Sequence, residues 1–319
     1  MLSPVDFIHD LLNPDLAFLP KALAVSLMSS IVAGVVGTFV VLRGMAFIGD
    51  AVAHAVFPGL AIAFVLQGNL VLGGAIAGVT TAVVVAVFAQ RQKLHEDSVI
   101  GVFFVAAFAL GIVIMSKAPG YAGSLQQFLF GAITGIPDED VLVIAVSGAL
   151  LLLIIVAFHK EFVTVTLDRE TARAAGLPVT ALDIMLYVAV AITVVISVQV
   201  IGNVLVLALL ITPAATARLL TERHGVMMLL APCIGAFSAI VGLYLSWSFD
   251  LAAGGAIVLT ATALFVAAWI ISPARSRAQR RAESRSEPAG DTGQRAVTTI
   301  PGAEGLPGAE GLGAGEARA

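Results

Sequence analysis

The sequence predicts an all-α, polytopic membrane protein, and three observations support this fold class. Of its 319 residues, 59% are hydrophobic and 12% are charged, whereas soluble domains have about 45–50% apolar and about 25% charged residues. The hydrophobic residues form runs of roughly 20, the length that a helix needs to cross about 30 Å of hydrocarbon. The charged residues fall mainly between these runs and after residue 271. This distribution is typical of a chain whose core lies in lipid.

About nine transmembrane helices are predicted, within a range of eight to ten. The number of spans within residues 183–219 is not fixed by the sequence. This stretch contains Gly202, Asn203 and Pro213, and it is compatible with two spans or with one span and a broken, re-entrant helix. Eight spans therefore remain an alternative. The predicted spans lie near residues 17–42, 50–67, 70–90, 98–116, 139–158, 183–200, 201–219, 226–248 and 253–271.

The basic residues between the spans predict the orientation. With nine spans, most of them fall on one side together with the Arg-rich segment 275–285, and the positive-inside rule makes that side cytoplasmic. The N-terminus is then outside and the C-terminus cytoplasmic. The residues that carry this prediction are Arg43, Arg91, Lys93, Lys160, Arg169, Arg173, Arg218 and Arg223.

Three parts of the chain are expected. Residues 1–15 contain three aspartates and no basic residue, so they predict a short extracytoplasmic segment and no cleavable signal peptide. Residues 16–271 form the transmembrane domain. Residues 272–319 are rich in Pro, Gly, Ala, Glu and Arg and repeat PGAEGL at 301–306 and 307–312. Such a composition buries too little apolar surface to fold, which predicts a disordered cytoplasmic tail.

Asp50 and His54 are the sharpest local anomaly. An ionisable residue inside a membrane helix is costly and is a functional hypothesis by default. Their spacing of four places both on one helical face. A carboxylate beside an imidazole suits divalent ions such as Zn²⁺ and Mn²⁺, although two ligands make half a site. The alternative is structural: Asp50 starts the helix by accepting from backbone amides, and His54 pairs with it.

A second feature is the longest polar interruption between spans, near residues 160–178. It predicts a short surface helix that Asp168 starts and Gly176 stops. Glu170 and Arg173 give this helix charges of both signs, with which it could dock a soluble partner. A solvated loop without a partner is the alternative interpretation.

A third feature is a set of polar and helix-breaking residues in the run after residue 198, namely Gln199, Asn203, Thr212 and Pro213. Proline removes a backbone hydrogen bond, and irregular helices at membrane depth are tolerated where they line a cavity or the protein interior. This pattern indicates either residues that line a pathway or ordinary hydrogen bonding between helices.

Composition also excludes several function classes. A single cysteine, Cys233, offers neither a disulfide framework nor a cysteine metal cluster. No basic stripe suggests nucleic-acid binding. No Gly-x-x-x-x-Gly-Lys-Ser/Thr phosphate loop is present, so any ATP hydrolysis would belong to another subunit. No enzyme chemistry and no resident cofactor are expected.

In three ordered regions, residues 15–271 resemble the zinc/manganese permease family of bacterial ATP-binding-cassette importers. The regions are Gly49-Asp-Ala-Val-Ala-His-Ala-Val-Phe-Pro-Gly59, Asp168-Arg-Glu-Thr-Ala-Arg-Ala-Ala-Gly176, and Gly202 through Pro213-Ala-Ala-Thr-Ala-Arg218. One departure is Ala252-Ala253-Gly254, which stands where the family often has a Pro-Thr-Gly-like turn. No role is carried over to that turn.

The resemblance implies the membrane subunit of a type II importer in the bacterial cell membrane. It implies a homodimer, two cytoplasmic ATPase subunits and an extracytoplasmic metal-binding protein. Asp50 and His54 would face the path of a transported ion, either zinc, manganese or iron, and 168–176 would be the coupling helix. The nine-span topology places Asp50 near the cytoplasmic start of its span, and a path site would be easier if residues 43–49 fold back into the bundle.

A stand-alone secondary carrier or channel is the alternative function. Such a protein would move ions without an ATPase, and many have inverted repeats with paired broken helices. The sequence offers one candidate for a broken helix, at 199–213. An intramembrane enzyme would require more polar residues at membrane depth than Asp50 and His54 supply.

Overall fold

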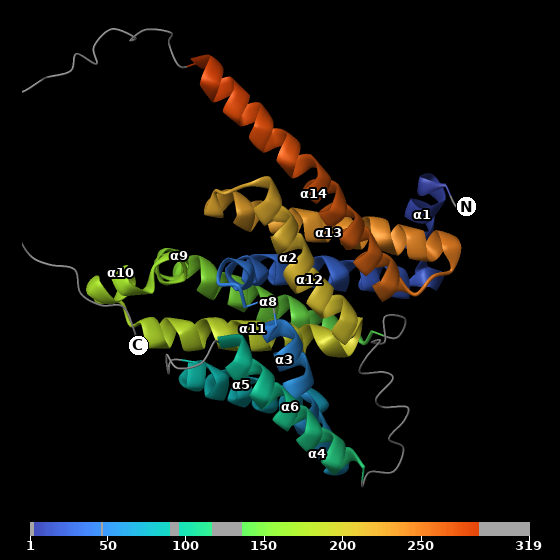
Figure 1. Cartoon of the computed structure of the whole chain (residues 1–319). Coiled ribbons are helices and arrows are strands. Elements are labelled where there is room, and N and C mark those ends of the chain that lie inside the picture. Colours follow the sequence, from blue (N-terminus) through green and yellow to red (C-terminus); the bar gives the residue numbers. More distant parts are fainter. Residues whose placement is uncertain (1–2, 46, 90–95, 117–135, 287–319) are drawn as a thin grey trace, which may run out of the picture. The chain divides into compact units, whose positions relative to one another are not determined.

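The computed structural model describes residues 3–45, 47–89, 96–116 and 136–286, and within these ranges all regular secondary structure is helical. Figure 1 shows the helices packed side by side, most of them in long, roughly parallel or crossing segments. The elements are α1 (Pro4–Leu11), the short turn η1 (Pro14–Leu16), α2 (Phe18–Leu42), α3 (Ile48–Ala55), α4 (Phe57–Val65), α5 (Leu70–Ala89), α6 (Glu96–Met115), α8 (Asp138–Ala157), α9 (His159–Leu167), α10 (Arg169–Ala174), α11 (Val179–Ile201), α12 (Asn203–Leu220), α13 (His224–Phe249) and α14 (Ala253–Ser286).

Eight segments of the described chain are long and apolar enough to cross a membrane, which confirms the predicted fold class. One of them, Ile48–Val65, consists of α3 followed directly by α4. The remaining predicted segment, 201–219, is α12, whose apolar part Val204–Leu220 is shorter than the other spans. The uncertain pair 183–219 is thus resolved into one long helix and one shorter helix, which separate at Gly202.

The core is built around α2 and α11. Of the most apolar stretches, 72% of the residues in α2, 67% in the α3–α4 span and 61% in α11 are buried, against 22% in α6, α8 and α14. A helix that is hydrophobic on all sides belongs inside a bundle. Close packing depends on small residues: a Cβ atom at Gly34 would lie 2.7 Å from the nitrogen of Pro232, and one at Gly37 would lie 1.8 Å from the carbonyl oxygen of Leu210.

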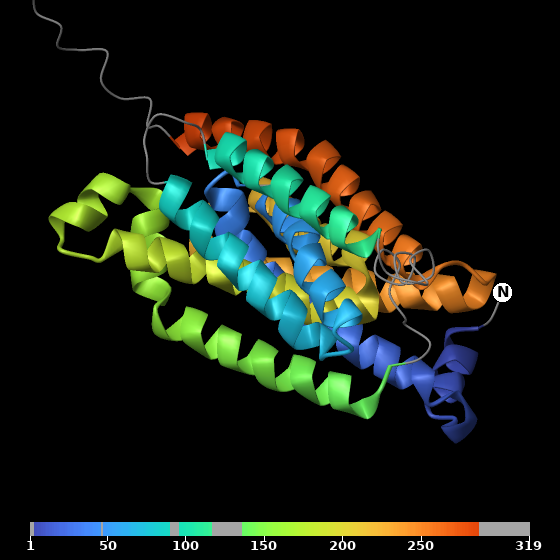
Figure 2. The same ribbon diagram turned by 90° about the horizontal axis from the view of Figure 1, so that it is seen from below.

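Contacts between distant residues define two ends of the bundle. At one end, the α10 end, Asp183 pairs with Arg43 and Arg169, and the rings of His159 and His224 stack with centroids 5.6 Å apart. At the other, the α1 end, the Lys21 ammonium lies 2.6 Å from the Asp138 carboxylate. Trp247 donates a hydrogen bond of 2.8 Å to Asp10 at this end as well. Figures 1 and 2 show α1 and α10 far apart along the bundle.

The end positions show that α12 crosses the bundle. Helix α11 starts beside α10, and the chain changes direction at Gly202 before α12 begins. The φ of Gly202 is 79°, a value that favours glycine. The chain then returns to the α10 end, because His224, shortly after α12, stacks on His159 at the start of α9. Near the same end, Ser272 of α14 donates a hydrogen bond of 3.0 Å to the Leu219 carbonyl.

The chain divides into two compact units, Met1–Arg275 and Ser276–Ala319. The described part of the second unit is the end of α14, which continues to Ser286. Residues 287–319, with the repeated PGAEGL segment, lie outside the described residues, so the disordered tail stays a prediction. Arg91 and Lys93 also lie outside them.

Candidate metal site and coupling segment

Helix α3, which carries Asp50 and His54, begins deep inside the bundle. A Cβ atom at Gly49 would lie 2.7 Å from a methyl carbon of Leu210 in α12. Leu210 lies ten residues before the end of α12 at Leu220, which is about 15 Å along a helix. Asp50 therefore lies well below the α10 end, and the chain folds back into the bundle between Arg43 and Gly49.

The fold-back is produced by a tight turn after α2. The Met45 amide donates to the Val40 carbonyl at 3.1 Å, and the Gly44 amide donates to Val41 at 3.2 Å. These two bonds form a Schellman motif, in which the residue after the cap adopts a left-handed conformation. Gly44 does so, with φ of 71°. Met45 and Ile48, each 1% exposed, anchor the returning chain in the core.

Asp50 and His54 meet on one face of α3, as their spacing predicts. The His54 Nε2 atom lies 3.4 Å from the Asp50 Oδ1 atom, and the exposed fractions of the side chains are 20% for His54 and 42% for Asp50. The carboxylate is therefore accessible from outside the single chain. The helix is interrupted just beyond the pair, because Pro58, at the start of α4, has no amide hydrogen to donate.

Two phenylalanines of α6 hold the His54 ring. The centroids of Phe104 and Phe108 lie 5.1 and 4.9 Å from that of His54, and Phe108 meets it edge to face. Such aromatic pairs are favourable beyond the area they bury. The Nδ1 atom of His54 is buried and has no hydrogen-bond partner in the described part of the chain. Packing on α6, with no hydrogen bond at that atom, thus sets the direction of the ring.

Within the described residues, no three His, Cys, Asp or Glu side chains converge on one point. Asp50 and His54 are consequently two donors of one oxygen and one nitrogen type, fewer than a bound Zn²⁺ or Mn²⁺ requires. Further ligands would have to come from water, from backbone carbonyls or from another chain.

The polar segment after α9 forms the short helix that the sequence predicts. Asp168 caps its start by accepting from the amides of Glu170 at 2.9 Å and Thr171 at 3.1 Å. The Thr171 hydroxyl also donates to Asp168. Gly176, with φ of 77°, ends the helix in a second Schellman motif, where the Leu177 amide bonds the Ala172 carbonyl. Both ends of this helix, α10, are therefore fixed by local bonds.

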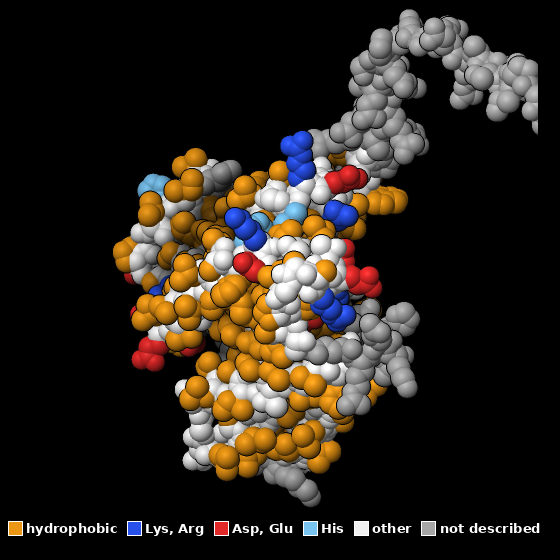
Figure 3. Space-filling view, turned by 90° about the vertical axis from the view of Figure 1, so that its left-hand side faces the viewer, with side chains coloured by type: hydrophobic (Ala, Val, Ile, Leu, Met, Phe, Trp, Pro, Cys, Tyr) orange, Lys and Arg blue, Asp and Glu red, His pale blue; other side chains and the backbone are white. Residues whose placement is uncertain are grey.

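The exposed side of α10 is charged, and its inner side is apolar. Ala172 is fully buried, whereas Glu170 and Arg173 are exposed. The hydrogen bond from the Thr171 side chain, followed by the amide bonds, lowers the pKa of the exposed Asp168 carboxyl below its ordinary value. A groove of about 410 Å³ runs beside the helix, lined by residues 42–43 and 165–170. Figure 3 looks onto this end and shows charged side chains of both signs among hydrophobic ones.

The predicted path or helix-break residues fall on two helices of the structure. Gln199 is in α11 and Asn203 begins α12, but their side chains lie outside the described residues. Pro213 is buried in α12, which continues through it, and its ring would lie 3.4 Å from a Cβ atom at Gly235 of α13. The change of direction falls at Gly202, and Pro213 packs between helices.

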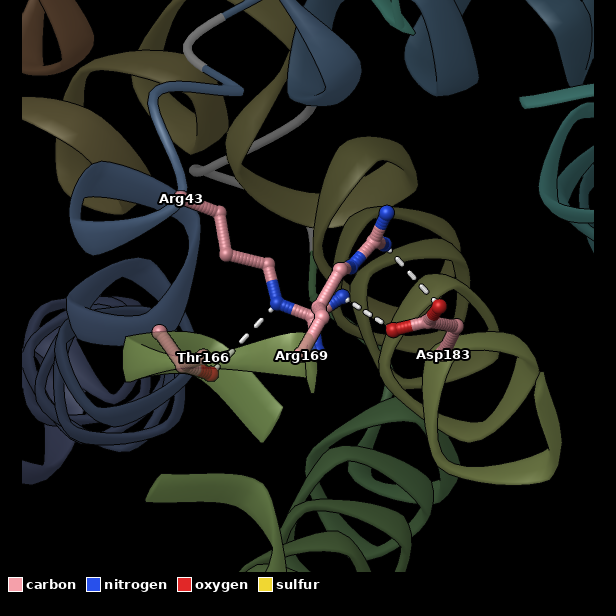
Figure 4. A network of polar contacts seen from close by, with 4 residues as sticks. All are labelled: Arg43, Thr166, Arg169 and Asp183. Carbon is pink, nitrogen blue, oxygen red and sulfur yellow. Dashed lines mark hydrogen bonds and ion pairs between the residues drawn. The ribbon is translucent and has the colours of Figure 1, made fainter. Parts of the chain in front are cut away.

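A buried ion network at the α10 end is absent from the sequence-based predictions. Arg43 Nη1 donates to Asp183 Oδ1 at 2.7 Å, and Arg169 Nη2 donates to Asp183 Oδ2 at 2.9 Å (Figure 4). The Arg43 and Asp183 side chains are only 5% and 4% exposed. One signal was available: Asp183 is an ionisable residue in an otherwise apolar run, which is a reason to suspect a role. Its partners, however, lie 140 and 14 positions away.

Comparison with known proteins places the chain in a family. Residues 15–272 match the ABC 3 transport family. The manganese transport system membrane protein MntC of Halalkalibacterium halodurans is 41% identical over 257 residues, which cover 81% of this chain and 88% of that protein. The manganese import system permease protein ScaB of Streptococcus gordonii is 35% identical over 267 residues, covering 84% and 96%.

Solved structures agree with this placement. The chain is similar to a chain of PsaBC from Streptococcus pneumoniae in complex with Fab, with a TM-score of 0.75, 35% identity, and coverage of 85% of this chain and 97% of that one. An inward-facing conformation of a putative metal-chelate type ABC transporter shares the fold, with a TM-score of 0.60 and 16% identity. The resemblance first noted in three sequence motifs is confirmed, and the chain belongs to the ABC 3 transport family as a membrane permease.

Proposed function

We propose that the chain is the membrane-spanning subunit of an ATP-driven importer for a divalent transition metal, with manganese as the first candidate. The observation that carries the proposal is the Asp50–His54 pair, which lies at mid-depth in the bundle of a permease whose relatives are named for manganese transport. A carboxylate suits Mn²⁺, and an imidazole suits Zn²⁺ and Fe²⁺ as well. Zinc and iron are therefore the competing substrates.

The ion path is proposed to lie between two copies of the chain. One copy supplies a single Asp50 and a single His54, and the Asp50 side chain is 42% exposed in the isolated chain. A second copy related by a two-fold axis would bring a matching pair, because a symmetric interface repeats the same residues from both sides. Four side-chain donors, completed by water, would fill the coordination of the ion during its passage.

Energy and substrate would come from separate partners. An ATPase subunit is proposed to dock on the exposed Glu170 and Arg173 of α10, beside the groove at that end of the bundle. An extracytoplasmic metal-binding protein would deliver the ion at the α1 end. This arrangement requires the α10 end to be cytoplasmic, as the basic residues predict.

Uptake of radioactive manganese and zinc tests the proposal. Proteoliposomes would contain the permease, its ATPase and its binding protein, with Asp50→Asn and His54→Gln as near-isosteric variants. Asp138→Asn is the matched control, because Asp138 is an exposed carboxylate at the α1 end. We expect ATP-dependent manganese uptake that both site variants abolish and the control retains.

Two results would overturn the proposal. Full uptake by both site variants would make the pair structural. Uptake in the absence of ATP and of the ATPase would point to the secondary carrier or channel.

A further inference from the structure

We propose that Asp183, held between Arg43 and Arg169, is a positioning residue that ties α10 to α3, so that a displacement of α10 reaches Asp50 and His54. The inference rests on the proposed function, because it gives the coupling segment a route to the metal pair. Two members of the network, Arg43 and Asp183, are buried, and the third, Arg169, reaches the groove beside α10.

The network joins four elements, three of them through one carboxylate. Arg43 caps the end of α2, Arg169 is the first residue of α10, and Asp183 lies one turn into α11. Each Asp183 oxygen accepts from a different arginine, at 2.7 and 2.9 Å. The Arg43 Nε atom also faces the Thr166 hydroxyl of α9, at 3.4 Å. Figure 4 shows the two guanidinium groups reaching the carboxylate from different elements.

Burial makes this connection rigid. The Arg43 and Asp183 side chains are only 5% and 4% exposed, and the Arg43 Nη2 atom is buried with no partner in the described part of the chain. Charges interact strongly where water is excluded, and removing one partner leaves an uncompensated buried charge. Helix α10 is joined to this buried pair through Arg169, so it cannot move independently of α2 and α11 unless the partly exposed Arg169–Asp183 pair breaks.

Arg169 is the residue of the network that is partly exposed at the protein surface. Its side chain is 37% exposed, far more than those of Arg43 and Asp183. It lines the groove beside α10 together with Glu170. A partner that shifts α10 would therefore pull first on the Arg169–Asp183 pair.

Two routes lead from the network to the metal pair. The covalent route runs from Arg43 through the Gly44 turn to the buried Met45 and into α3. The packing route runs along α11, where Tyr187 lies one turn beyond Asp183 and is 1% exposed. Tyr187 lines a small cavity together with Ile48, Ala51, Val52 and Phe104, which are on α3 and on the α6 face that holds His54.

Hydrogen–deuterium exchange of the full-length permease in lipid nanodiscs tests the connection without any partner. We expect Arg169→Gln to raise exchange both in residues 166–176 and in residues 43–54, with a smaller rise for Arg169→Lys, which keeps the charge. Lys21→Gln, which breaks the ion pair at the α1 end, should change neither segment. A rise confined to 166–176 in Arg169→Gln would overturn the proposal.

In the reconstituted complex, the amount of metal transported per ATP hydrolysed distinguishes a positioning role from a merely structural one. Loss of folded protein lowers transport and ATP hydrolysis together, whereas loss of positioning lowers the metal moved per ATP. We expect this ratio to fall about threefold or more in Arg169→Gln and to recover in part in Arg169→Lys. An unchanged ratio would contradict the inference. If the wild type moved no metal, the proposed function would fail, and the exchange experiment would still decide the connection.

Asp183→Asn is the more severe variant, because it leaves Arg43 without its carboxylate in a buried place. Where it folds, it should raise exchange in 43–54 more than Arg169→Gln does. Where it does not fold, the partly exposed Arg169 gives the decisive variants.

Discussion

Two aspartates within the bundle have opposite surroundings, which separates their roles. Asp183 is buried and accepts from two arginines, so its charge is fully compensated by the protein. Asp50 is half-exposed and faces only the His54 imidazole at 3.4 Å in the described structure. An intramembrane carboxylate is costly unless something compensates it. This difference supports the proposal that Asp50, and not Asp183, meets the transported cation.

The aromatic contact on His54 leads to a prediction about affinity. Replacing Phe104 and Phe108 together by leucine removes the ring faces that orient the imidazole, which lie 5.1 and 4.9 Å from it. Hydrogen-bonded groups that orient a metal ligand typically contribute 10- to 100-fold in affinity, and we expect ring packing on the proposed ligand His54 to act at the lower end of that range. We expect the manganese concentration for half-maximal uptake to rise about tenfold, measured in proteoliposomes.

Phe103→Leu is the control for that experiment. Phe103 lies on the same helix but packs against Phe88, at a centroid distance of 5.0 Å. It should leave the half-maximal concentration unchanged. An equal increase in the control would show that α6 packing in general, and not the His54 contact, sets the affinity.

The cap residue of α10 has a predictable response to pH. Hydrogen bonds from Thr171 and Glu170 favour the ionised Asp168 carboxylate and hold its pKa below the ordinary value of 3.8. Because the folded pKa is the lower one, the cap stabilises α10 fully above the ordinary value and is lost as the pH falls through the folded value. Carboxyl ¹³C NMR of the permease in nanodiscs should show Asp168 titrating below its ordinary pKa.

Asp168→Asn serves both to assign the signal and to test the cap. Asparagine is an equally good helix cap but does not titrate. The variant should keep α10 intact across the same pH range. A signal that titrates at or above the ordinary value would show that the cap bonds do not form in the membrane.

At the scale of elements, short segments of sequence determine where the helices begin and end, whereas the contacts between helices depend on how the whole bundle packs. Helix α10 could be predicted because its start and stop lie in one short segment, Asp168 to Gly176. The spans could be predicted because hydropathy is a local property. The pairing of Arg43 with Asp183 could not, since it joins positions 140 apart. The same holds for His54 and Phe104, whose helices are separate in the sequence.

The depth of Asp50 shows why sequence reasoning stopped short of the site. Counting from the start of its span places Asp50 near the membrane edge. The Gly44 turn and the contact of Gly49 with Leu210 place it near the middle of α12 instead. Such a fold-back depends on how α3 packs against α12, and no local pattern encodes that. The pair itself was found because its spacing of four is local.

The close approach of α2 and α12 leads to a prediction about stability. A methyl group at Gly37 would lie 1.8 Å from the Leu210 carbonyl oxygen, so the two helices would have to separate. Overpacking of this kind costs typically 1–3 kcal/mol, and backbone atoms cannot yield as a side chain can. We expect Gly37→Ala to lower the melting temperature in detergent and, because α12 also contacts α3, to reduce uptake.

Gly101→Ala is the matched control, because Gly101 is a helical glycine and a methyl group added there would have nothing within 4 Å of it in the described structure. Its melting temperature should stay equal to that of the wild type or rise slightly, since alanine favours helix by about 0.5–1 kcal/mol. Equal losses in both variants would mean that helix flexibility, and not close packing, requires the glycines.

For the whole molecule, the two ends of the bundle predict the topology. The ends of α2 and α12 and the starts of α9, α11 and α13 are joined at the α10 end by Asp183 and by the His159–His224 stack. The starts of α2 and α8 and the end of α13 are joined at the α1 end. If α12 is counted with the eight candidate spans, the described chain has nine segments, and we expect residues 3 and 272 to lie on opposite sides of the membrane. The basic residues Arg43, Arg169 and Arg223 then share the α10 end.

Single cysteines in a Cys233→Ala background test this topology in intact cells with a membrane-impermeant thiol reagent. Glu170→Cys and Glu222→Cys flank the α11–α12 pair, and we expect both to react only after the membrane is opened, because both belong to the α10 end, which the proposed orientation makes cytoplasmic. Gln67→Cys and Ala252→Cys, in the connections after α4 and α13, should react from outside. If α12 were re-entrant, Glu222→Cys would react from outside while Glu170→Cys would not. That result would reverse the orientation of α13 and α14, and Ala252→Cys would be protected.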